Sequence, residues 1–69
     1  MRYWSFNEPG ANGENIVETF SDQEILDRYW DYWSAQKIAK YGRDEFEKNY
    51  WRLDCIDAWC AINGAWEST

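Results

Sequence analysis

Hydrophobic and polar residues alternate near the start of the chain. In residues 2–6 (RYWSF) and residues 15–20 (NIVETF), apolar side chains recur at about every second position, which is the spacing of a β-strand. The segment between them contains two dipeptides typical of turns, Pro9-Gly10 and Asn12-Gly13. This pattern predicts a β-hairpin over residues 2–20. We interpret its polar loop, residues 7–14, as a connector rather than a contact loop.

A helical pattern follows the predicted hairpin. Ser21 and Glu24 have the spacing of a capping box, in which each side chain accepts a hydrogen bond from the other residue's backbone N–H. At roughly 100° per residue, the larger apolar side chains that follow fall within an arc of about 180°. They are Ile25, Leu26, Tyr29, Trp30, Tyr32, Trp33 and Tyr41. Gly42 then supplies a helix stop, so we predict one long helix from Ser21 to Tyr41.

The chain after Gly42 predicts shorter elements. Residues 43–50 are helical by propensity, but one continuous helix would carry Asp57 towards the core. We therefore expect a break near residues 51–53 and a second short helix that is capped by Asp54 and runs to Ile62.

The C-terminal residues 65–67 (AWE) are expected to return as an extended segment beside the hairpin. The sequence thus predicts one small α+β domain over residues 1–69. Its N-terminal β-hairpin, extended by this third C-terminal strand, would pack on one long helix and one or two short helices.

Aromatic residues dominate the expected core. The chain has six Trp, five Tyr and three Phe residues, and each buried ring removes roughly 150–250 Å² from water. The side chains that we expect in the core are Trp4, Phe6, Val17, Phe20, Ile25, Tyr29 and Trp33. A domain of 69 residues cannot enclose six tryptophans completely. The rings that we expect at the surface are Trp30, Tyr32, Trp51 and Trp66.

Acidic residues exceed basic ones by thirteen to seven, which gives a net charge of -6. Direct binding to nucleic-acid phosphates is therefore disfavoured, because it depends on Lys and Arg. Glu24, Asp27 and Asp31 form an acidic stripe on the long helix. The simpler interpretation is a solvated face on which Arg28 pairs with Glu24 and Asp31; the alternative is a rim that binds a basic partner.

Residues for catalysis or metal binding are sparse. The chain has no His, and Cys55 and Cys60 are interpreted as reduced, semi-buried residues. The acidic stripe could serve acid–base chemistry or a hard cation, but surface ion pairs explain it more simply. We expect no enzyme activity, no cofactor and no metal site. With no export signal and no apolar run of ~20 residues, a cytoplasmic location is expected.

Several short motifs carry a resemblance. They are Phe6-Asn7-Glu8-Pro9, Tyr29-Trp30-Asp31-Tyr32-Trp33 and Asp54-Cys55-Ile56-Asp57-Ala58-Trp59, followed by Asn63 and Ala65-Trp66-Glu67. This pattern resembles small proteins of unassigned function that tailed myoviruses of marine cyanobacteria encode. The resemblance implies a phage origin and carries no site residues over to this chain.

The leading hypothesis for function is a protein-interaction module with an acidic and aromatic face. Its partner would be a host or phage protein with a basic, partly apolar surface, and the mode of binding includes imitation of nucleic-acid charge. The residues assigned to this face are Glu24, Asp27, Trp30, Asp31, Tyr32, Trp51 and Trp66. Two alternatives are a homodimer that buries surplus tryptophans and a binder of small ligands or nucleic acid.

Overall fold

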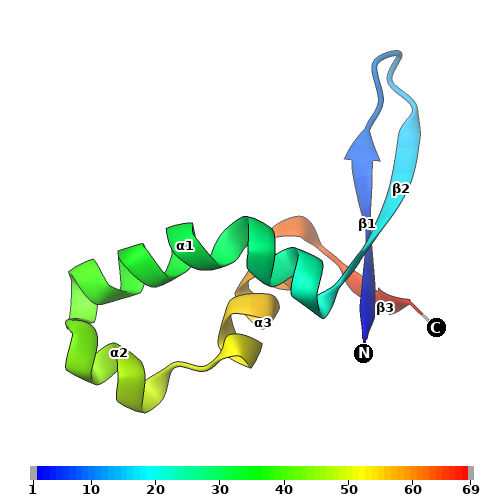
Figure 1. The fold of residues 1–69 in the computed structure, drawn as a ribbon. Helices are drawn as coiled ribbons and strands as arrows, with labels where there is room; N and C mark the ends of the chain where they lie inside the picture. Colours follow the sequence, from blue (N-terminus) through cyan, green and yellow to red (C-terminus); the bar gives the residue numbers. More distant parts are fainter. Residues whose placement is uncertain (1, 69) are drawn as a thin grey trace.

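The computed structural model describes residues 2–68. Three strands and three helices follow one another in the order β1, β2, α1, α2, α3 and β3 (Figure 1). Their bounds are β1 (Tyr3–Pro9), β2 (Asn15–Ser21), α1 (Asp22–Tyr41), α2 (Arg43–Asn49), α3 (Arg52–Asn63) and β3 (Trp66–Ser68). The predicted α+β fold, with an N-terminal hairpin, a long helix and a third C-terminal strand, is confirmed.

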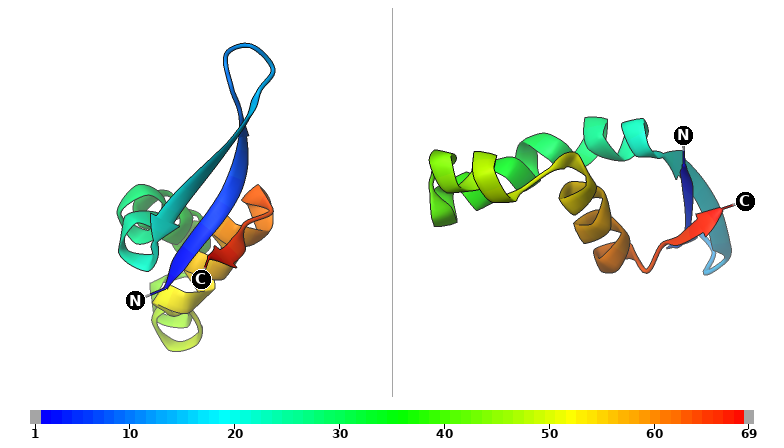
Figure 2. Two further views of the ribbon diagram at one scale, coloured as in Figure 1. Left: turned by 90° about the vertical axis from the view of Figure 1, so that its right-hand side faces the viewer. Right: turned by 90° about the horizontal axis from the view of Figure 1, so that it is seen from below.

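The three strands form an antiparallel sheet in the order β2-β1-β3. Tyr3 of β1 pairs with Ser21 of β2 on one side and with Ser68 of β3 on the other. The helices lie on one side of this sheet, and its other side is left open (Figure 2).

The loop of the hairpin is shorter than predicted. Strand β1 continues to Pro9, which pairs with Asn15, so the connecting segment is residues 10–14 instead of 7–14. The Gly10 N–H donates to the Glu14 carbonyl oxygen at 2.6 Å, and Gly13 has a φ of 77°. Proline can stand at the end of a strand because the ladder needs no further donor there.

Long helix α1 begins at the predicted capping box. The Ser21 hydroxyl accepts from the Glu24 N–H at 3.2 Å, and the Glu24 carboxylate accepts from the Ser21 N–H at 3.2 Å. At the other end, Gly42 adopts a φ of 92° and donates its N–H to the Ile38 carbonyl oxygen at 2.8 Å. Both predicted boundaries of this helix are confirmed.

Helix α3 begins three residues earlier than predicted. Trp51 is its N-cap residue, whereas Asp54 is the third residue of the helix. The Asp54 carboxylate accepts from the Trp51 N–H at 2.7 Å. The prediction that Asp54 is the N-cap residue is therefore wrong. Its side chain still takes part in the cap, because a carboxylate at the third helical position can reach back to the backbone N–H of the N-cap residue.

Two clusters of buried side chains hold the elements together. The first lies between the sheet, α1 and α3 and contains Phe6, Ile25, Ile56 and Trp59. The second lies between α1, α2 and α3 and contains Trp33, Phe46 and Cys55. Leu26 and Tyr29 of α1 pack against both clusters, so one helix connects the whole core.

Val17 lies outside this core, contrary to the prediction. Its side chain is 57% exposed and its pairing partner is Asn7. This register places Val17 on the face of the sheet away from Phe20 and the helices, since neighbouring residues in a strand point to opposite faces. Ile16 and Val17 are both apolar, so the alternation alone did not identify the buried face.

Replacing Ile25 by Val tests the central role of α1. Ile25 is fully buried, so we expect the free energy of unfolding to fall by about 0.5–1.5 kcal/mol. Ile62→Val is the matched control, because Ile62 is also helical but 70% exposed; its effect should stay within about 0.5 kcal/mol. Urea unfolding followed by far-UV circular dichroism measures both. Equal losses in the two variants would contradict this description of the core.

Candidate partner-binding groove

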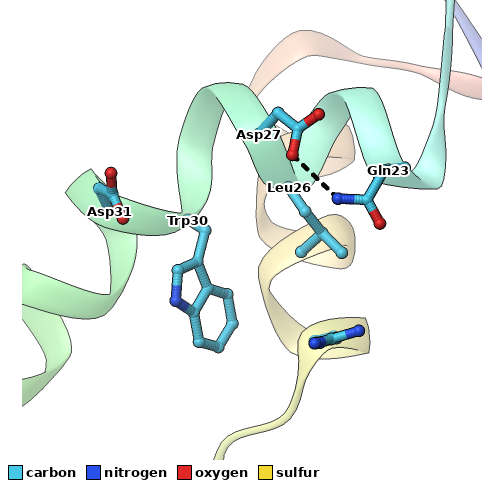
Figure 3. A pocket seen from close by; sticks show the side chains of 6 residues that line it. Gln23, Leu26, Asp27, Trp30 and Asp31 are labelled. Atoms are coloured by element: carbon cyan, nitrogen blue, oxygen red, sulfur yellow. Dashed lines mark hydrogen bonds between the residues drawn. The ribbon is translucent and has the colours of Figure 1, made fainter.

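A groove runs between α1 and the beginning of α3, with a volume of about 340 Å³. In Figure 3, Leu26 and Trp30 point from α1 towards α3. Asp27 and Asp31 also stand on α1 and form the edge of the groove on that side. The six lining residues are Gln23, Leu26, Asp27, Trp30, Asp31 and Arg52. We call this feature the α1–α3 groove.

The geometry of helix α1 explains this arrangement. Leu26 and Trp30 are four residues apart and therefore share one side of the helix, as do Asp27 and Asp31 on the adjoining side. The Trp30 ring lies 5.6 Å from Trp33 and 5.9 Å from Phe46, measured between ring centroids. These neighbours hold the half-buried indole in place and leave part of it open to the groove.

Arg28 does not neutralise the acidic stripe, so the predicted ion pairs with Glu24 and Asp31 are wrong. Its guanidinium lies 4.5 Å from the centre of the Phe20 ring. Within residues 2–68, no salt bridge joins it to either carboxylate. A guanidinium is weakly hydrated and stacks well on an aromatic face, which competes with a solvent-exposed ion pair that contributes little.

The groove carries charges of both signs. The Gln23 side-chain amide donates to the Asp27 carboxylate at 2.9 Å, which fixes one acceptor at the rim. Arg52 approaches from α3, but in the described part of the chain it forms no salt bridge with Asp27 or Asp31. Two carboxylates and one guanidinium are thus available to a bound group.

The structure separates the other residues that the sequence assigned to the binding face. The Glu24 carboxylate is engaged at the start of α1. Tyr32 is 59% exposed but lies about 200° around α1 from Trp30, and its hydroxyl accepts from the Gln36 amide at 2.9 Å. Trp51 is 71% exposed at the start of α3, outside the groove lining.

Trp66 belongs to yet another surface, because it stands on β3 beside Ser5. Of the predicted set, Asp27, Trp30 and Asp31 therefore converge. Sequence reasoning missed Arg52, whose approach to α1 depends on how α3 crosses that helix; no spacing along the chain indicates it. Leu26 was assigned to the apolar face without a role in binding.

Among residues 2–68, no three His, Cys, Asp or Glu side chains converge as a metal site requires. In the same part of the chain, none of the helices combines the length and the apolar character that crossing a membrane requires.

Both cysteines are free thiols. Cys55 is fully buried, and this burial raises the pKa of its thiol to about 11. Burial also raises the pKa of Cys60, and the negative charges of Asp57 and Asp22 add to the effect. A thiolate is the reactive form, so neither residue is prepared for nucleophilic attack.

A thiol-modification experiment checks this state directly. In a Cys60→Ser variant at pH 8, we expect 5,5′-dithiobis(2-nitrobenzoate) to modify Cys55 at least ~100-fold more slowly in the folded chain than in urea, because burial and the raised pKa both suppress thiolate. The absorbance of the released thionitrobenzoate gives the rate. Comparable rates in the folded and unfolded chains would show that α3 opens readily.

A second acidic feature lies on the hairpin and was not anticipated from sequence. Phe6 pairs with Glu18 and Ile16 pairs with Glu8, so the two carboxylates are diagonal neighbours on one face. The hydrogen bond with Glu8, and then the negative charge of Glu8, raise the pKa of Glu18. One proton is therefore held more tightly by this pair in the folded chain than in the unfolded chain.

The hairpin pair makes a prediction for pH dependence. The folded-state pKa of Glu18 is raised, so the protonated side chain favours the folded chain. This contribution to the free energy of unfolding is present at pH values below 4.5 and is lost as the pH rises through the raised pKa. Glu8→Gln should lower the Glu18 pKa towards its ordinary value, which a ¹³C NMR titration of the side-chain carboxyl measures. An unchanged Glu18 titration in that variant would exclude Glu8 as the cause.

Comparison of the chain with models of protein families, with curated proteins and with solved structures found no match. No relative therefore transfers an activity or a ligand to the α1–α3 groove. The geometry and charge of the groove itself are the observations that bear on function.

Proposed function

We propose that this protein is a small, non-enzymatic interaction module of phage type. In this proposal the α1–α3 groove binds an arginine side chain of a host or phage protein. The observation that carries the proposal is the position of the half-buried Trp30 indole beside two carboxylates that no arginine or lysine of the described chain neutralises.

An arginine side chain suits each part of this groove. Its guanidinium can stack over the Trp30 ring, since indole is the aromatic group that best attracts a cation. Its methylene groups can lie against Leu26. Asp27 and Asp31, one helical turn apart, offer acceptors for the planar set of N–H donors, which lysine lacks.

Arg52 narrows the choice of partner. A guanidinium on the α3 side of the groove repels a run of consecutive basic residues, but it can donate to a carbonyl or carboxylate of the partner. A single arginine within a mixed sequence therefore fits better than a polybasic segment. For the same reason, the geometry gives less support to imitation of nucleic-acid charge, which needs carboxylates alone.

The setting of this interaction follows from the sequence resemblance. A phage-encoded module would meet its partner in the cytoplasm of the infected host cell. Binding of nucleic acid is not part of the proposal, because the chain carries a net charge of -6 and the groove holds two carboxylates.

An NMR titration with two short peptides tests the proposal. One peptide contains a single arginine flanked by glycine and leucine, and the other has citrulline in its place, which keeps the shape and removes the charge. We expect the arginine peptide to shift the Trp30 indole N–H and the amides of Asp27, Asp31 and Arg52. The citrulline peptide should leave these signals unchanged.

Matched variants locate the interaction. Asp27→Asn combined with Asp31→Asn should weaken arginine-peptide binding at least ~10-fold, since each lost charge–charge contact contributes about 1 kcal/mol. Asp44→Asn combined with Glu45→Gln changes the net charge equally on the exposed surface of α2 and should preserve binding. Equal responses to arginine and citrulline, or equal losses in both double variants, would overturn the proposal.

A further inference from the structure

Arg52 brings a charge without a partner into the α1–α3 groove. The other three arginines of the chain are each engaged. Arg2 and Arg43 form salt bridges with carboxylates. Arg28 stacks on the Phe20 ring. Within residues 2–68, Arg52 forms no salt bridge and stacks on no aromatic ring, so its guanidinium is free to bind a group from outside the chain.

The sequence around Arg52 explains why its charge has no partner. A helical side chain meets the side chains three and four residues along. For Arg52 these are Cys55 and Ile56, which are buried in the core and carry no charge. Arg43 of α2, by contrast, meets Glu47 four residues along. Helix α3 therefore has no carboxylate on the side where Arg52 stands.

The groove keeps its positive charge apart from its negative charges. Leu26 and Trp30 point from α1 towards α3 and form the apolar part of the groove (Figure 3). Asp27 and Asp31 lie about 100° further round α1, beyond this apolar pair as seen from α3. Arg52 stands on α3, and in the described part of the chain its guanidinium forms a salt bridge with neither carboxylate. Charges of opposite sign thus line one space from different helices.

We propose that Arg52 binds a carboxylate that lies beside the partner's arginine, so that the groove recognises an arginine–carboxylate pair. This inference rests on the proposed arginine-binding function and names the second group of the partner. The partner's guanidinium contacts Asp27 and Asp31, and its carboxylate accepts hydrogen bonds from Arg52. Each charge of the groove then meets a charge of opposite sign.

A carboxylate suits Arg52 better than other acceptors do. A guanidinium can donate two parallel hydrogen bonds to the two oxygens of a carboxylate, whereas a carbonyl has one oxygen. A carboxylate also offsets the repulsion between Arg52 and the partner's arginine, which share a groove of about 340 Å³. A phosphate carries roughly two negative charges, so Asp27 and Asp31 would repel it more strongly.

The size of the groove limits the distance between the partner's two groups. Its volume of about 340 Å³ is near the lower end of the roughly 300–1,000 Å³ typical of ligand sites. In an extended segment, side chains two residues apart point to the same side, whereas adjacent side chains point to opposite sides. A glutamate two residues from the arginine can therefore enter with it. The α-carboxylate of a C-terminal arginine supplies the same chemistry from the arginine itself.

NMR titration with two pairs of peptides tests this proposal. The first pair is Gly-Leu-Arg-Gly-Glu and Gly-Leu-Arg-Gly-Gln, both with capped ends. The second pair is Gly-Leu-Arg with a free C-terminal carboxylate and the same peptide as its amide. For the wild type we expect the carboxylate member of at least one pair to bind about 3–5-fold more tightly, which is the upper range for an exposed ion pair. The pair that shows this gain identifies the source of the carboxylate.

Arg52→Gln locates the carboxylate contact. This variant should lose the gain but still bind the neutral arginine peptides, because Trp30, Asp27 and Asp31 are unchanged. Lys48→Gln is the matched control: Lys48 is an exposed residue of α2 outside the groove lining, so its replacement alters the net charge equally and should preserve the gain. In the wild type, the Nε–H signal of Arg52 should shift with the carboxylate peptides and stay in place with the neutral ones.

An isomeric peptide separates contact from general charge effects. Gly-Leu-Arg-Glu-Gly has the same charge as the first peptide, but in an extended segment its carboxylate points to the opposite side from the arginine. We expect no gain with this isomer over its glutamine counterpart. A gain as large as that of Gly-Leu-Arg-Gly-Glu would reject a positioned contact with Arg52.

The outcomes separate this inference from the arginine-binding function. Equal affinities within both peptide pairs would overturn the inference, as would a gain that Arg52→Gln leaves intact. In either case the neutral arginine peptides still bind, so the proposed function stands. If no arginine peptide binds, or citrulline binds as well as arginine, the proposed function itself fails and this inference fails with it.

Discussion

The arrangement of this domain depends on the packing of one helix against both halves of the core. Helix α1 spans Asp22–Tyr41 and contributes Ile25 to one buried cluster and Trp33 to the other. Leu26 and Tyr29 lie between them and contact both clusters. Since a 20-residue helix is about 30 Å long, it extends well beyond the small sheet. Its far end is covered by α2 and the Phe46 ring instead.

The contribution of α1 to two separate buried clusters also creates the groove. Helix α3 contributes Ile56 to the first cluster and Cys55 to the second, so it must cross α1 near their junction. Arg52, the first residue of α3, lines the groove together with Trp30 of α1. The indole is thus both a support for the Trp33–Phe46 cluster and an exposed surface for a ligand.

The sequence predicted local features well and contacts between distant segments less well. The capping box at Ser21 and the stop at Gly42 depend on neighbouring residues, and both were predicted correctly. The environment of Val17 depends on the strand register, and that of Arg28 depends on the Phe20 ring of the preceding strand. The groove required the crossing of α1 and α3, so sequence spacing placed Asp27, Trp30 and Asp31 together but could not supply Arg52.

The pairing of β3 with β1 has a consequence for the order in which the domain forms. Strands β1 and β2 are joined by a short loop, whereas Tyr3 and Ser68 meet only when nearly the whole described chain is present. During synthesis, β1 can therefore form its hydrogen bonds with β2 early. The hydrogen bonds along its other edge can form only after residues 66–68 have left the ribosome. Until then, this second edge of β1 is unpaired and can pair with another nascent chain.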